Sequence, residues 1–120
     1  MRLGLCSLAV AVALLPASMA HAKDANGVSR IWGVGGDSCV KFLNDRQSPL
    51  TLKPYESWLG GFITGINSQI PDTYDITGGT DMDGLLEWIA QWCGVNPASK
   101  FLYGAQAYMV FAYPSRIRSK

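Results

Sequence analysis

Carboxylates and cysteines are the side chains of this sequence that could carry chemistry. The 120 residues include nine Asp or Glu, three Cys and one His. Asp83 and Glu87 are four residues apart, so they would share one face of a helix, and paired carboxylates perform acid–base catalysis in glycosidases. Acids also occur near helix N-termini for stability alone, because they interact favourably with the helix dipole. We therefore expect no enzyme, and a carboxylate-based hydrolase is only the third hypothesis for function.

The single histidine, His21, belongs to a predicted signal peptide over residues 1–22. Met1-Arg2 is a basic start, residues 3–15 form an almost unbroken apolar run, and Ala20-His21-Ala22 is a small-x-small cleavage site. The run is shorter than the roughly 20 residues that a membrane-spanning helix needs. We expect an exported protein without a membrane anchor after cleavage, and a periplasmic one if the source is Gram-negative.

The cysteines predict one disulfide. Cleavage removes Cys6 and leaves Cys39 and Cys93, and two cysteines in an exported chain are expected to pair. Such a bridge would close a loop of about 55 residues and contribute about 4 kcal/mol in the chain-entropy model. With the cysteines paired and no histidine left, the usual zinc sites and histidine-dependent nucleophiles are excluded. We expect neither a metal nor a cofactor.

Charge is distributed unevenly along the part expected to remain after cleavage. Ten Lys or Arg less Arg2 leave nine, equal to the nine Asp or Glu, whereas a nucleic-acid binder would be clearly basic. Residues 54–99 contain acids and no base, and residues 114–120 form a basic tail. This acidic region either steers a basic partner or is simply a solvated face. The candidate partner-binding residues within it are Asp72, Asp75, Asp81, Asp83, Glu87 and Trp88.

The spacing of apolar residues predicts an all-α fold, a compact bundle of about four helices with one disulfide. The helical domain spans residues 38–113, between a polar, glycine-rich lead-in at residues 23–37 and the basic tail, which we expect to be loose. Apolar residues recur at helical spacing, and no segment shows the alternation of a strand. Trp88 falls somewhat off the apolar stripe of its helix, so it could be exposed.

Capping residues and prolines predict where the first two helices begin. Asp37 or Ser38 would cap a short helix, because their oxygens accept orphan backbone N–H groups. Pro54 suits the first position of the second helix, where no N–H is needed. Small residues recur four apart along that helix: Ser57, Gly61 and Gly65. They would let a neighbouring element approach closely, and a dimer face is the alternative.

Similar signals bound the third and fourth helices. Thr80 with Asp83 resembles a capping box at the start of the third helix. Gly94 fits the left-handed position just past its end. Asn96-Pro97 would then start the fourth helix, and Pro114 would end it.

Two segments resemble a known family. They are YESWLGGFITGIN at residues 55–67 and DGLLEWIAQWCGVNP at residues 83–97. They resemble a group of small exported bacterial helical proteins with one disulfide, which is similar to the immunity proteins that protect cells from type VI secretion amidase toxins. The resemblance covers about Ser38 to Met109. It implies a periplasmic binding protein that inhibits a cell-wall amidase toxin, and it carries over no catalytic residue.

A second resemblance supplies the alternative function. The acid-stress periplasmic chaperones are also small, helical and bridged once over a comparable span. In acid this chain would move from a net charge of zero to about +9, counting its nine bases, and would loosen as its carboxylates are protonated. Under either function the partner is another protein, a toxin or a set of unfolded clients, and not a nucleic acid.

Overall fold

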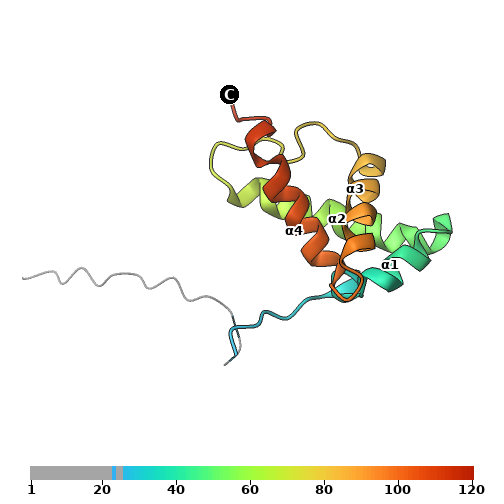
Figure 1. The fold of residues 1–120 in the computed structure, drawn as a ribbon. Coiled ribbons are helices and arrows are strands. Elements are labelled where there is room, and N and C mark those ends of the chain that lie inside the picture. Colours follow the sequence, from blue (N-terminus) through green and yellow to red (C-terminus); the bar gives the residue numbers. More distant parts are fainter. Residues whose placement is uncertain (1–22, 24–25) are drawn as a thin grey trace, which may run out of the picture. The chain divides into compact units, whose positions relative to one another are not determined.

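The computed structural model describes residue 23 and residues 26–120, so the predicted signal peptide lies outside the described residues. The chain divides into two units, Met1–Arg30 and Ile31–Lys120, and the described helices all belong to the second unit. They are η1 (Gly33–Gly36), α1 (Cys39–Asp45), α2 (Pro49–Gln69), α3 (Met82–Val95), α4 (Phe101–Ala112) and η2 (Tyr113–Ser115), where η marks a 3-10 helix. The described residues include no strand, so the predicted all-α fold is confirmed (Figure 1). None of the described helices is long and apolar enough to cross a membrane.

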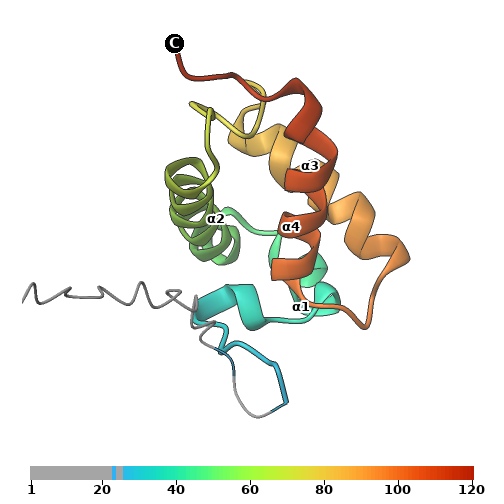
Figure 2. The ribbon, with the colours of Figure 1, turned by 90° about the vertical axis from the view of Figure 1, so that its left-hand side faces the viewer.

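A disulfide and a close helix contact hold the second unit together. The predicted bridge between Cys39 and Cys93 is confirmed, with an S–S distance of 2.05 Å, and it ties α1 to α3. Helices α3 and α4 lie side by side (Figure 2). Gly104 permits this approach, because a Cβ there would lie only 3.0 Å from side-chain atoms of both Ile89 and Trp92.

Three aromatic rings from α1, α2 and α4 form the centre of the core. Phe42, Tyr55 and Phe101 are all fully buried, and their ring centroids lie 4.6–5.1 Å apart in tilted or edge-on pairs, the arrangement that aromatic rings prefer. Helix α3 adds the buried Leu85 and Ile89 to this core. The rings therefore unite helices from the beginning, the middle and the end of the described chain.

The observed start of α1 confirms its prediction, whereas the observed start of α2 corrects its prediction. Ser38 caps α1, because its hydroxyl oxygen accepts the backbone N–H of Lys41 at 3.1 Å. The prediction for α2 was wrong: it begins at Pro49, and Pro54 lies inside the helix. Ser48 is extended and Pro49 occupies the first position, so the pair already supplies a helix start five residues earlier.

The starts and ends of α3 and α4 also differ from expectation by a few residues. Asp81, not Thr80, is the N-cap of α3, and Gly94 lies within that helix. Helix α4 begins at Phe101 instead of Pro97, because residues 96–99 form a turn closed by the bond from the Ser99 N–H to the Asn96 carbonyl. Such shifts arise because several neighbouring residues could act as caps.

The glycines of α2 do not have the packing role that their spacing predicts. A Cβ built on Gly60, Gly61 or Gly65 would meet no other atom within 4 Å. The small-residue face of α2 is therefore open, and the predicted close approach of another element there is wrong. Close glycine contacts occur elsewhere in the described chain, among them those at Gly35 and Gly104.

Candidate protein-binding surface

Two of the predicted partner-binding acids hold the C-terminal tail against the loop between α2 and α3. Asp72 forms an ion pair with Arg118. The Asp75 carboxylate accepts the backbone N–H of Thr77 at 2.9 Å and so caps the following turn. The Asp75 backbone pairs with Ile117, whose N–H donates to the Asp75 carbonyl at 2.9 Å. The tail is thus fixed by backbone and side-chain contacts, contrary to the loose tail that we expected.

The three acids of α3 have separate roles. Asp81 accepts the Gly84 N–H at 2.8 Å as the helix cap, and Asp83 lies exposed in the first turn. Glu87 pairs with Arg46 and thereby links α3 to α1. The Arg46 guanidinium holds the pKa of Glu87 below its usual range, so Glu87 is a poor general acid near neutral pH. A basic partner at Asp81 or Glu87 would have to compete with these internal contacts, whereas Asp83 is exposed.

Trp88, the sixth candidate, is half-buried between α3 and α4. Its ring lies edge-on to Tyr108, with centroids 5.2 Å apart, and 5.4 Å from the ring of Phe111. Tyr108 is buried, whereas Phe111 is 64% exposed. Trp88 therefore supports an aromatic side chain that faces solvent, and its contact with α4 was not evident from the sequence.

Large apolar side chains gather around the C-terminal end of α4. Val110 is 76% exposed and Tyr113 is 45% exposed. A groove of about 240 Å³ lies between the ends of α2 and α4, lined by Ile70, Met109, Val110 and Tyr113. We define the α4-end surface as the groove residues together with three further exposed side chains: Phe111 on the α3 side of α4, Ile117 in the tail, and Tyr74, whose backbone N–H donates to the Ile117 carbonyl.

Basic residues border the α4-end surface. The Arg116 guanidinium lies 4.0 Å from the centre of the Tyr113 ring, in cation–π geometry, and its Nε donates to the Thr73 hydroxyl. A cleft of about 510 Å³ lies between Tyr74 and the tail residues 117–120, which include Arg118 and Lys120. The surface thus combines an apolar centre with a cationic edge. The sequence contained a weak signal for it, since residues 101–115 include no charged residue.

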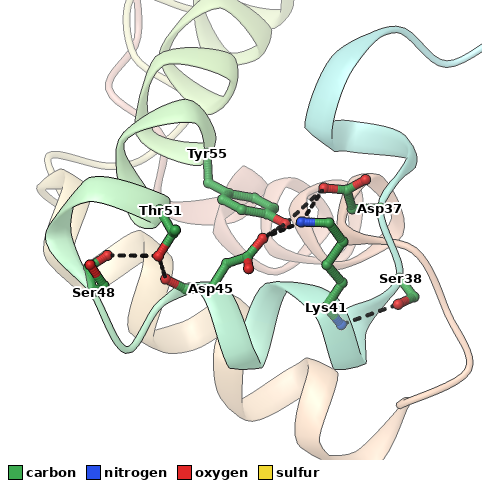
Figure 3. Close-up of polar contacts among 7 residues, drawn as sticks. All are labelled: Asp37, Ser38, Lys41, Asp45, Ser48, Thr51 and Tyr55. Carbon is green, nitrogen blue, oxygen red and sulfur yellow. Dashed lines mark hydrogen bonds and ion pairs between the residues drawn. The ribbon is translucent and has the colours of Figure 1, made fainter.

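A cluster of polar side chains that the sequence did not predict surrounds the hydroxyl of Tyr55, away from the α4-end surface (Figure 3). This hydroxyl lies 2.8 Å from a carboxylate oxygen of Asp37 and 2.9 Å from one of Asp45. Its single proton can serve only one of them at a time, and Lys41 forms ion pairs with both carboxylates. The spacing of Asp37, Lys41 and Asp45, four apart, was the available signal, but nothing indicated that Tyr55 would join them.

The electrostatics of this cluster indicate a structural role. Burial, together with hydrogen bonds to the two carboxylates, raises the pKa of Tyr55, so the phenol stays protonated as a donor. The Lys41 ammonium and the Tyr55 hydroxyl hold the pKa of Asp45 below its usual range. Neither group is therefore suited to exchange protons near neutral pH. The cluster joins α1 and the segment before it to α2.

Neither a metal site nor a known relative indicates a function for the described residues. Within the described residues, no three His, Cys, Asp or Glu side chains gather closely enough to hold a metal ion. No protein-family model, no curated protein sequence and no solved structure matches the chain.

Proposed function

We propose that this chain is an exported, non-enzymatic binding protein that engages another protein through the α4-end surface. The observation that supports this is the exposure of Val110, Phe111 and Tyr113 at the C-terminal end of α4, where Val110 and Tyr113 line an apolar groove. Exposed apolar patches with a polar border mark protein–protein contacts. Aromatic side chains and Arg carry much of the binding energy at such contacts, and here Arg116 and Arg118 border the patch.

The specific form that we propose is an inhibitor of a cell-wall amidase toxin, as the family resemblance implies. An inhibitor benefits from a surface that is ordered before binding, because less conformational entropy is then lost on association. The bridge from Cys39 to Cys93 ties two helices together, and the Asp75–Ile117 pairing fixes the tail beside the surface. These contacts support a preorganised binding face.

Affinity capture from native periplasmic extract at pH 7 tests this function. Wild-type protein is expected to retain one dominant partner in stoichiometric amount. The double variant Val110→Ser/Phe111→Ser should bind that partner about 30-fold or more weakly, because truncating central interface residues costs about 2 kcal/mol or more. Leu50→Ser is the matched control, since Leu50 is 83% exposed but lies at the other end of the fold, near the start of α2. Equal binding by the wild type and both variants would show that the α4-end surface does not bind the partner.

An acid-stress chaperone is the second candidate, and the ion pairs favour it. Carboxylates join distant parts of the chain at three places: Glu87 pairs with Arg46, Asp72 pairs with Arg118, and Asp37 and Asp45 accept from the Tyr55 hydroxyl while they pair locally with Lys41. Acid would neutralise all of these carboxylates and raise the positive charge. The same capture repeated at pH 3 separates the candidates, because a chaperone would retain a broad set of unfolded clients only in acid.

A further inference from the structure

The segment Ile31–Asp37 lies flat against one aromatic side chain of α2. The indole N–H of Trp58 donates to the Trp32 carbonyl at 2.8 Å. A Cβ built on Gly35 would lie only 2.1 Å from the Trp58 ring. Contact this close is possible only because glycine has no side chain. The segment therefore covers Trp58 with its backbone.

The surface beneath this segment is ordered by contacts of its own. The Trp58 ring stacks on Phe62, with centroids 5.2 Å apart and planes 10° apart. It also lies edge-on to Phe101 of α4, at 5.7 Å. The indole is thus held from behind by two helices. It would keep its place if the covering segment moved away.

The covering segment itself buries few side chains. Three of its seven residues are glycine, Trp32 is 70% exposed, and Ile31 and Val34 are only half-buried. Segments with few buried apolar contacts open at a lower free energy than the core. The cost of opening this segment should therefore lie below that of unfolding the whole domain.

One end of the segment is firmly anchored. The Phe101 N–H donates to the Asp37 carbonyl at 2.9 Å, and the Tyr55 hydroxyl contacts the Asp37 carboxylate. Figure 3 shows Asp37 at this junction, one turn before Lys41. Cys39, two residues after Asp37, forms the disulfide with Cys93. The segment is therefore a strap with a fixed end at Asp37, from which it runs over Trp58.

We propose that the Trp58 face of α2 is a docking site for a glycine-containing peptide segment that forms a 3-10 turn, and that Ile31–Asp37 occupies it as a removable strap. Two features of Trp58 would recognise such a segment. Its indole N–H donates to a backbone carbonyl, here that of Trp32, and its ring leaves room only for a glycine three residues later, here Gly35. A partner segment with the same spacing would compete with the strap. This site shares no residue with the α4-end surface, so the two proposals stand or fall separately.

A pair of glycine variants tests the strap. Gly35→Ala places a methyl group into the Trp58 ring, whereas Gly36→Ala is the matched control because its Cβ would lie 3.8 Å from Ile31, an ordinary contact. The readout is hydrogen exchange of the Trp58 indole N–H by NMR, with the resonance assigned from its loss in Trp58→Phe. We expect exchange about 100-fold faster or more in Gly35→Ala, with the helical circular dichroism signal retained, and a wild-type rate in Gly36→Ala. A protected indole in Gly35→Ala, the same effect in both variants, or loss of the helices would overturn the proposal.

Two further measurements do not depend on how well the Gly35→Ala variant folds. In the wild type, the Trp58 indole N–H should exchange at least about 100-fold faster than the backbone N–H of Ile89 in the core; equal protection would overturn the proposal. A synthetic peptide with the sequence of residues 29–38 should also restore protection when added to the Gly35→Ala protein. The same peptide with alanine in place of Gly35 should not, and failure of the unmodified peptide would exclude a docking site.

Discussion

The side chain of Tyr55 connects the aromatic core to a surface cluster of charges. Its ring packs against Phe42 and Phe101, whereas its hydroxyl reaches the carboxylates of Asp37 and Asp45. A hydrogen bond contributes about 1 kcal/mol to stability, and one to a charged group about 1.5–3 kcal/mol. At this position a single oxygen atom therefore matters for the stability of the whole domain.

Removing that oxygen is the first prediction. Tyr55→Phe should lower the free energy of unfolding by about 1–3 kcal/mol, because the two carboxylates lose their shared donor while the ring keeps its packing. Urea unfolding followed by circular dichroism measures the change. Tyr103→Phe is the control, since Tyr103 is exposed and surface changes usually stay within about 0.5 kcal/mol. Equal stability of Tyr55→Phe and the wild type would contradict the structural role of the cluster.

The second prediction concerns pH. The folded-state pKa of Asp45 is lowered, mainly by the Lys41 ammonium and then by the Tyr55 hydroxyl. A lowered pKa stabilises the fold above the unfolded value of about 3.9, and this contribution is lost as pH falls through the folded value. Unfolding free energies measured from pH 7 to pH 2 should therefore fall more steeply for the wild type than for Asp45→Asn. Parallel curves for the two proteins would show that Asp45 is not stabilised by its neighbours.

Helices α2 and α4 use glycine in opposite ways. Gly61 and Gly65 face open space in α2, whereas Gly104 of α4 lies against α3. Glycine inside a helix costs about 0.5–1 kcal/mol relative to alanine when no contact requires it. The same substitution should therefore have opposite effects in the two helices.

This contrast gives the third prediction. Gly61→Ala/Gly65→Ala should raise the free energy of unfolding by about 1–2 kcal/mol, since each alanine favours the helix and meets no neighbour. Gly104→Ala should lower it by about 1–3 kcal/mol, because its methyl group would press on Ile89 and Trp92. Urea unfolding measures both changes: the midpoint should lie above that of the wild type for the α2 variant and below it for Gly104→Ala. A loss of stability in the α2 variant would mean that something covers its glycine face in solution.

For the molecule as a whole, the disulfide is a large part of the stability. Cys39 and Cys93 are separated by 54 positions, and closing a loop of that length contributes about 4 kcal/mol in the chain-entropy model. Small domains are stable by only about 5–15 kcal/mol in total. The fourth prediction is that Cys39→Ser/Cys93→Ser loses about 4 kcal/mol, measured by urea unfolding without reductant. The wild type in reductant should show the same loss, and an unchanged midpoint in both would contradict it.

Sequence patterns anticipated the features of this fold that depend on local spacing or on few choices. Helical periodicity indicated the α-helices, and assigning Cys6 to the predicted signal peptide left one pairing, Cys39 with Cys93. The start of α1 was predicted correctly, but the starts of α2, α3 and α4 were missed by one to five residues, because nearby residues such as Ser48-Pro49 and Pro54 carry the same signal.

The candidate site was harder to anticipate because its contacts are long-range. Arg46 pairs with Glu87 across 41 positions and Arg118 with Asp72 across 46, and no local spacing encodes such pairs. Helix α4 is apolar on most sides, so its sequence does not indicate which side chains are buried by α2 and α3. The exposure of Val110 and Phe111 is evident only from the structure. The local pattern in the sequence favours the acidic residues as a binding site, although most of them serve internal contacts.

The position of the disulfide also determines what happens if the backbone is cut. The loop between α2 and α3 lies within the stretch that the bridge spans, with Cys39 on one side and Cys93 on the other. A protease that cleaves once in this loop would produce two fragments, yet both would migrate as one species until a reductant is added. In an oxidising compartment, the molecule could be nicked there and still not come apart.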